Sequence, residues 1–283
     1  MRLHANLAGI DVGDGFPVRL VGAINISPES FYSGSVAQGR RGLQRLAQTM
    51  VAEGADLLDI GAMSTAPYVK GAIVETEERK RMTAAVRAVR QVVTVPISVD
   101  TQRSSVAAAA LDAGAAVIND VSGLRHDAAM GTVARHAAGV ILMASEEGAS
   151  REPPMRMVAS LLRGCLRRAR SSGVDRRRIV LDPGIGFFRR AALPWYEFDC
   201  VVLSQLSRLR RLRRPLLVGL SRKSFIGKLS GRTGPAERLP GSLAATAIAV
   251  YNGAALIRTH DVGATRDAVR IASALRAAGE SDQ

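Results

Sequence analysis

The sequence of 283 residues has little of several features that often decide an interpretation. It contains only two cysteines, Cys165 and Cys200, in no CxxC pattern, so neither a zinc site nor a disulfide framework is expected. No apolar run reaches the roughly 18 residues that a membrane-spanning helix needs, because the best stretch, residues 243–257, contains Asn252 and Gly253. The first residues also lack the pattern of a secretory signal. We therefore expect a cytoplasmic protein with no membrane partner.

Negative charge and aromatic residues are scarce too. The chain has 39 Lys+Arg against 25 Asp+Glu, a net charge of +14, and aromatic residues make up 4% of it. A basic chain invites a nucleic-acid interpretation. However, the arginines of residues 163–178 and 208–214 recur at helical spacing beside leucines, with almost no aromatic side chains to stack on bases. We interpret them as solvated helix faces, expect no nucleic-acid partner, and note that the charge would attract an anionic substrate.

What the sequence does contain is a repeated order of elements. Eight short apolar runs, each followed by a segment of helical period, predict alternating strands and helices, and continuous rather than alternating hydrophobicity is typical of parallel strands. The strands are expected at residues 19–26, 57–61, 97–100, 117–121, 140–143, 179–182, 216–220 and 256–259, and the helices near 38–54, 75–92, 103–113, 127–137, 155–172, 195–213, 238–252 and 263–278. Eight such units predict an α/β fold, a single (β/α)8 TIM barrel, with a doubly wound sheet as the alternative. We expect one domain over residues 1–283, with its core at about 18–278.

Polar residues stand at the ends of six predicted strands, where a barrel of this kind carries its functional residues. Carboxylate and amide groups at Asp100, Asn119 and Asp182 suit an N–H-rich heterocycle, whereas cations at Lys223 and Arg258 suit phosphate oxygens. Together they predict a ligand with a heterocycle at one end and phosphate at the other. Three further polar residues at strand ends are interpreted as cap or turn residues: Thr101, Ser122 and Asp261.

Seven successive segments carry a resemblance to a known family. They are GAINISPESF at residues 22–31, LDIG at 58–61 with Ser64 and Thr65, ISVDT at 97–101, INDV at 118–121, LDPGIGF at 181–187, SRKSFIG at 221–227 and RTHDV at 258–262. In this order they resemble the signature segments of dihydropteroate synthases. The resemblance implies a pterin-binding barrel that condenses 6-hydroxymethyl-7,8-dihydropterin pyrophosphate with an arylamine, p-aminobenzoate in that family, and releases pyrophosphate.

The same resemblance implies a role for individual residues. The pterin ring would be bound by Asp100, Asn119, Met143, Asp182 and Lys223, and the pyrophosphate by Asn25, Arg258 and His260. Asn25 would also bind Mg²⁺, the implied cofactor. The arylamine pocket would include Phe31, Thr65, Pro67, Phe187 and Ser224, and the catalytic set would be Asp100, Asp182, Lys223 and Arg258. The family further implies a homodimer.

The sequence departs from the family in its loops. Where the second loop usually reads GESTRPG, residues 62–68 read AMSTAPY, so Ala66 stands in place of an arginine, and residues 144–147 read ASEE without the usual histidine. Loss of the loop arginine weakens recognition of an anionic acceptor. Three hypotheses follow: p-aminobenzoate as the acceptor in folate biosynthesis, the same chemistry with ribofuranosyl-aminobenzene phosphate in tetrahydromethanopterin biosynthesis, or a pterin-binding protein without synthase activity.

Overall fold

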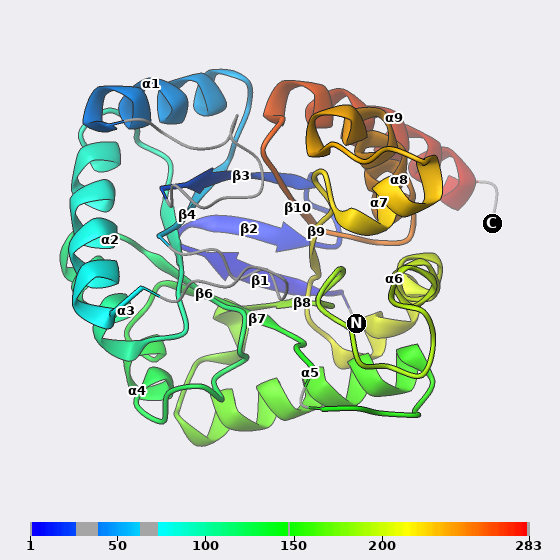
Figure 1. Ribbon diagram of the computed structural model, residues 1–283, viewed down its shortest axis with the longest axis horizontal. Helices are drawn as coiled ribbons and strands as arrows, with labels where there is room; N and C mark the ends of the chain where they lie inside the picture. The colour runs from blue at the N-terminus through cyan, green and yellow to red at the C-terminus, as the bar shows by residue number, and fades with distance from the viewer. Residues whose placement is uncertain (1, 27–38, 63–72, 147, 282–283) are drawn as a thin grey trace.

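The computed structural model describes residues 2–26, 39–62, 73–146 and 148–281. Eight parallel strands form one sheet in the order β8-β7-β6-β5-β4-β3-β10-β9, and a parallel bridge between Leu181 and Leu216 joins its two edges (Figure 1). This arrangement confirms the predicted (β/α)8 barrel over the open sheet. The strands are β3 (Arg19–Asn25), β4 (Leu57–Gly61), β5 (Ile97–Asp100), β6 (Val117–Asp120), β7 (Gly139–Met143), β8 (Ile179–Asp182), β9 (Leu217–Gly219) and β10 (Leu256–Thr259).

Helices surround these strands (Figure 1). They are α1 (Gly39–Ala52), α2 (Glu75–Arg90), α3 (Ser104–Asp112), α4 (Met130–Ala134), α5 (Pro154–Ser171), α6 (Trp195–Ser204), α7 (Ser224–Ser230), α8 (Leu239–Tyr251) and α9 (Val262–Ser281). The helix expected at 195–213 instead breaks at Gln205, and a 3₁₀ helix (Leu206–Leu212) follows. In that segment every third residue is a buried leucine and the arginines between them are exposed. Across the described ranges, no helix is both long and apolar enough to cross a membrane.

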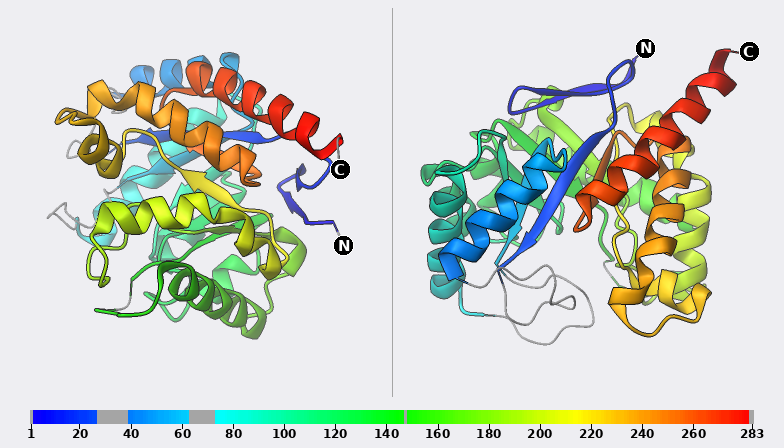
Figure 2. Two further views of the ribbon diagram at one scale, coloured as in Figure 1. Left: turned by 90° about the vertical axis from the view of Figure 1, so that its right-hand side faces the viewer. Right: turned by 90° about the horizontal axis from the view of Figure 1, so that it is seen from above.

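An N-terminal hairpin, which the sequence analysis missed, covers one end of the barrel (Figure 2). Strands β1 (His4–Leu7) and β2 (Ile10–Gly13) pair antiparallel around a two-residue turn in which Ala8 and Gly9 both have positive φ, 53° and 92°. Leu7 and Val12 are buried in a cluster formed by residues at or near the amino ends of the barrel strands, such as Leu57 and Val117. The amino ends of the strands are therefore sealed by apolar packing, and the carboxyl ends lie at the other end of the barrel.

Candidate active site

The polar side chains predicted from strand ends lie together at the carboxyl end of the barrel. Asn25 ends β3, Asp100 ends β5, Asp182 ends β8, Asn119 is next to last in β6, and Arg258 is next to last in β10. Adjacent strands are paired in register there, with Asn25 opposite Gly61 and Asp100 opposite Asn119. Because each residue comes from a different strand, closure of the barrel is what brings them into one site.

Arg258 is held by two buried carboxylates. Its Nε donates to Asp59 Oδ2 at 2.6 Å, and its Nη2 lies 3.6 Å from Asp100 Oδ2. Asp59, which is fully buried on β4, also accepts a hydrogen bond of 3.1 Å from Asn119 Nδ2. Asp59 was not predicted as a site residue, because it lies in the body of its strand, two residues before the end. It joins the cationic and the amide-rich parts of the site.

Burial shifts the pKa values of three side chains at the carboxyl end of the barrel, which is called the barrel mouth below. Burial, and then repulsion by Asp59, raises the pKa of the Asp100 carboxyl. Burial also raises the pKa of Asp182, although the nearby Lys223 charge opposes this change. The amine of Lys223 has its pKa lowered to about 8, chiefly by burial and against the attraction of Asp182 and Asp199. Groups perturbed by burial and by named charge partners in one place are typical of functional sites.

The loop after β8 shapes the surroundings of Lys223. Lys223 Nζ donates to the carbonyl oxygen of Ile185 and lies 4.7 Å from the centroid of the Phe187 ring. Gly186 has φ of +84°, and a Cβ there would lie 2.9 Å from Lys223 Cδ, so a glycine is required for this approach. Asp199 on α6 accepts from the Gly186 N–H at 2.8 Å. This contact links the loop to the helix that follows it.

His260 lies beside Asn25 at the phosphate-favouring part of the mouth. Its Nε2 is 3.2 Å from Asn25 Nδ2, and its Nδ1 is 3.0 Å from Ser221 Oγ. Burial, and then the charge of Arg258, lowers its pKa to about 3, so the imidazole is neutral at physiological pH. Ser221 Oγ is in turn 3.4 Å from Asp261 Oδ2. Because the Asp261 carboxylate only accepts, Ser221 donates to it, His260 Nδ1–H donates to Ser221, and the Asn25 amide nitrogen donates to His260 Nε2.

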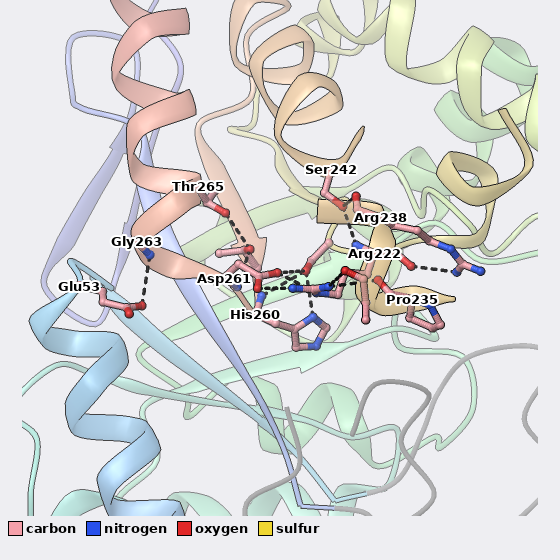
Figure 3. A network of polar contacts seen from close by, with 12 residues as sticks. Glu53, Arg222, Pro235, Arg238, Ser242, His260, Asp261, Gly263 and Thr265 are labelled. Atoms are coloured by element: carbon pink, nitrogen blue, oxygen red, sulfur yellow. Dashed lines mark hydrogen bonds and ion pairs between the residues drawn. The ribbon is translucent and has the colours of Figure 1, made fainter. Parts of the chain in front are cut away.

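Behind His260, Arg222 and Asp261 form a buried ion pair (Figure 3). Arg222 Nη2 donates to Asp261 Oδ1 at 2.6 Å and its Nε donates to Oδ2 at 2.9 Å, while Nη1 donates to the Ala236 carbonyl at 2.8 Å. Asp261 stands directly before α9, where its carbonyl oxygen accepts from the Thr265 N–H at 3.0 Å, and its carboxylate pairs with an arginine 39 residues away in the chain. Arg222 has φ of +55°, an uncommon backbone for a residue with a Cβ. The ion pair holds the turn that leads directly into Lys223.

Ser122 and Thr101 make the local contacts that the turn interpretation predicts. Ser122 Oγ accepts hydrogen bonds of 3.2 Å from the backbone N–H groups of Arg125 and His126. Thr101 Oγ1 accepts from the backbone N–H of Arg103 at 3.3 Å. Both hydroxyls thus bind backbone donors shortly after their strands, and Thr101 Oγ1 also donates to Glu78 Oε1 at 2.7 Å.

The remaining predicted residues divide into described and undescribed ones. Met143 ends β7 and is 2% exposed, Phe187 is half-buried, and Ser224 begins α7, where its Oγ accepts from Arg189 Nη2 at 2.7 Å. Phe31, Thr65 and Pro67 lie outside the described residues, as does Ala66. A cavity of about 300 Å³ opens beside Phe187 and is also lined by Gln102, Val121, Ser122, Arg125, His126, Ser145 and Glu146.

Comparison with known proteins identifies the family. Residues 21–260 match the family described as "Pterin binding enzyme". The dihydropteroate synthase of Synechocystis sp. is 37% identical over 265 residues, which cover 90% of this chain and 89% of the relative. The chain belongs to the dihydropteroate synthase family.

Solved structures of dihydropteroate synthases share this fold. The Xanthomonas albilineans dihydropteroate synthase, solved with 4-aminobenzoic acid, is 34% identical with a TM-score of 0.86, and the match covers 98% of this chain and 99% of that one. The Thermus thermophilus dihydropteroate synthase, solved with 6HMPPP, is 39% identical with a TM-score of 0.80, covering 97% and 100%. Membership in the dihydropteroate synthase family makes the chain an enzyme of the transferase class.

Proposed function

We propose that this dihydropteroate synthase family member condenses 6-hydroxymethyl-7,8-dihydropterin pyrophosphate with p-aminobenzoate and releases pyrophosphate, a step of folate biosynthesis. The observation that carries the proposal is the buried polar set at one barrel mouth, in which Asp59 binds both Arg258 and Asn119 beside Asp100. An unpartnered buried carboxylate is costly. Asp100 Oδ1 is buried without a hydrogen-bond partner among the described residues, as expected of a group that binds an N–H-rich ring.

We assign the pterin ring to Asp100, Asn119, Asp182 and Lys223, with Met143 packed against it. When the bond between the ring's methylene carbon and pyrophosphate breaks, positive charge develops on the pterin. That charge would favour the ionised forms of Asp100 and Asp182, whose pKa values burial raises, and the two carboxylates would in turn stabilise it in a site of low polarity. The arylamine nitrogen then forms the new bond to carbon and loses a proton. Phe187 and Ser224 would line the arylamine side, together with Phe31, Thr65 and Pro67.

We assign the departing pyrophosphate to Arg258, His260 and Asn25. Arg258 supplies positive charge, and His260 orients the Asn25 amide, whose nitrogen lies 3.2 Å from its Nε2. The residues fit a Mg²⁺ ion bound largely through the substrate, because Mg²⁺ commonly combines one or two protein oxygens with substrate phosphates. Within the described ranges, no group of three His, Cys, Asp or Glu side chains could hold a metal alone. The Asn25 amide oxygen is a suitable ligand, and the ion would neutralise charge on the leaving group.

The alternatives from the sequence are less well supported. The relatives over nearly the full chain are dihydropteroate synthases, and one structure was solved with 4-aminobenzoic acid. This favours p-aminobenzoate over the ribofuranosyl-aminobenzene phosphate of tetrahydromethanopterin biosynthesis, and catalysis over simple pterin binding.

We also propose a cytoplasmic homodimer. Large apolar side chains on α8 and α9 are more than half exposed, which is typical of a surface that a second copy covers. They are Tyr251, Ile271 and Leu275. Sedimentation velocity on the purified protein would detect a monomer if this proposal is wrong.

An assay of pyrophosphate release tests the proposed function. Purified protein is supplied with the pterin pyrophosphate, Mg²⁺ and each amine in turn, and we expect turnover with p-aminobenzoate. The variant Asp182→Asn should lose pterin binding, measured by calorimetry, whereas Asp175→Asn, at a surface turn, should keep it. If neither amine supports pyrophosphate release, the synthase assignment is contradicted. Normal pterin binding by Asp182→Asn would contradict the site.

A further inference from the structure

Arg189 lies in the loop between β8 and α6, two residues after Phe187. Its Nη2 donates to Ser224 Oγ at 2.7 Å, and its guanidinium carbon lies 4.1 Å from the centroid of the Trp195 ring. Stacking on an aromatic face fixes the plane of a guanidinium group and reduces the entropy that it loses when it binds a ligand. Arg189 is therefore held beside two residues, Phe187 and Ser224, that the proposed function assigns to the arylamine pocket.

Glu146 holds the same loop from the end of β7. Its carboxylate accepts hydrogen bonds from the backbone N–H groups of Arg189 at 3.1 Å and Arg190 at 2.6 Å. Glu146 belongs to the segment ASEE, where the chain departs from its family. Because its two oxygens are directed at backbone donors, this acidic residue positions the arginine loop. One departure from the family thus supports the placement of Arg189.

The charge of Arg189 reaches the centre of the site. Burial is the main cause of the lowered pKa of Lys223, and the Arg189 charge contributes to it. Lys223 lies over Phe187, and Ser224 is the next residue in the chain. An anionic group placed against Ser224 would therefore be attracted by both cations.

We propose that Arg189 binds the carboxylate of the arylamine acceptor, in place of the arginine that the second loop lacks at Ala66. This inference rests on the proposed function and names the residue that selects the acceptor. A guanidinium group carries five N–H donors in a planar fork that matches a carboxylate, so it can bind Ser224 and a ligand carboxylate at the same time. The Ser224 hydroxyl accepts from Arg189 and can donate its own hydrogen to the same carboxylate. An acceptor without a negative group would lose the contact.

A comparison of two acceptors isolates this contact. The wild type is assayed with p-aminobenzoate and with p-aminobenzamide, which keeps the amine and removes the charge. In Arg189→Leu we expect kcat/KM for p-aminobenzoate to fall about 10- to 100-fold, as for a lost charge-assisted hydrogen bond. The value for p-aminobenzamide should change less than about threefold. Arg190→Leu is the matched control, because it removes the same charge from the neighbouring exposed residue, and it should resemble the wild type.

A second variant separates charge from local structure. Arg189→Gln keeps an N–H donor for Ser224 and removes the charge, so it should show the same selective loss. The assignment of Arg189 would be overturned if kcat/KM fell equally for both amines in both variants, or if it did not fall for p-aminobenzoate. In either case, an active wild type would still uphold the proposed function. A wild type that binds the pterin pyrophosphate and turns over neither amine would overturn both.

Discussion

Replacement of Asp59 by asparagine tests the contact that organises the site. Asp59 is completely buried and binds Arg258 at 2.6 Å and Asn119 at 3.1 Å. An amide of the same shape keeps an acceptor oxygen for one partner and removes the negative charge. The substitution therefore changes electrostatics and orientation with little change in packing volume.

The structure bounds the size of the effect. Loss of one partner of a buried ion pair costs about 3–5 kcal/mol, and a hydrogen bond to a charged group contributes about 1.5–3 kcal/mol. Arg258 is 22% exposed and keeps Asp100 at 3.6 Å, so its charge is partly compensated. We expect a loss of about 2–3 kcal/mol in the free energy of unfolding, which lowers Tm by about 4–10 °C in a chain of this size.

The loss should also depend on pH, and the sign follows from Asp100. Burial and then Asp59 raise the pKa of Asp100, so the stability that its protonated form contributes is present at low pH and lost as pH rises through the raised value. Asp59→Asn removes the repulsion between the two carboxylates, which matters only when Asp100 is ionised. The Tm deficit of the variant should therefore be smaller at pH 9 than at pH 6.

Calorimetric unfolding and pterin titration measure these effects. The dissociation constant for the pterin pyrophosphate should rise about 10-fold or more, equivalent to about 1.4 kcal/mol. Asp56→Asn is the matched control, since Asp56 pairs with Arg19 at 3.0 Å with both side chains about a quarter exposed, and it should leave pterin affinity unchanged. A Tm within 1 °C of the wild type with unchanged affinity, or a deficit that widens as pH rises, would refute the role given to Asp59.

Two further predictions concern opposite ends of the barrel. Lys223, with its pKa lowered to about 8, should be acylated at a rate whose pH midpoint is near 8, and bound pterin pyrophosphate should suppress this acylation. Peptide mapping can follow the reaction, because the only other lysines in the sequence are Lys70, Lys80 and Lys228. A midpoint above pH 10 would contradict the prediction. Leu7→Ala, in the hairpin, should lower the free energy of unfolding by about 2–5 kcal/mol and leave kcat within twofold of the wild type. Leu7 is 1% exposed in the cluster at the amino ends of the strands, at the other end of the barrel from the site. A large fall in kcat with unchanged Tm would contradict a purely stabilising role of the hairpin.

Local patterns were enough to predict the barrel strands. Four of the eight, β4, β5, β8 and β10, begin and end where the apolar runs predicted, because a strand buried on both faces leaves a continuous apolar run. The hairpin escaped prediction because its turn, Ala8-Gly9, is not one of the usual Asn-Gly or Asp-Gly signals. Asp59 could not be predicted from its position, because it lies inside β4 and not at its end.

The sequence by itself determined the order of elements, the family and the polar residues at the strand ends, since each of these follows from neighbouring residues in the chain. Tertiary structure alone decided which of those residues meet. Asp59 contacts Asn119 across 60 residues and Arg258 across 199, and Arg189 contacts Ser224 across 35. Such pairs leave no local pattern, because barrel closure joins strands that are distant in sequence, and burial then sets the pKa values of Asp100 and Lys223.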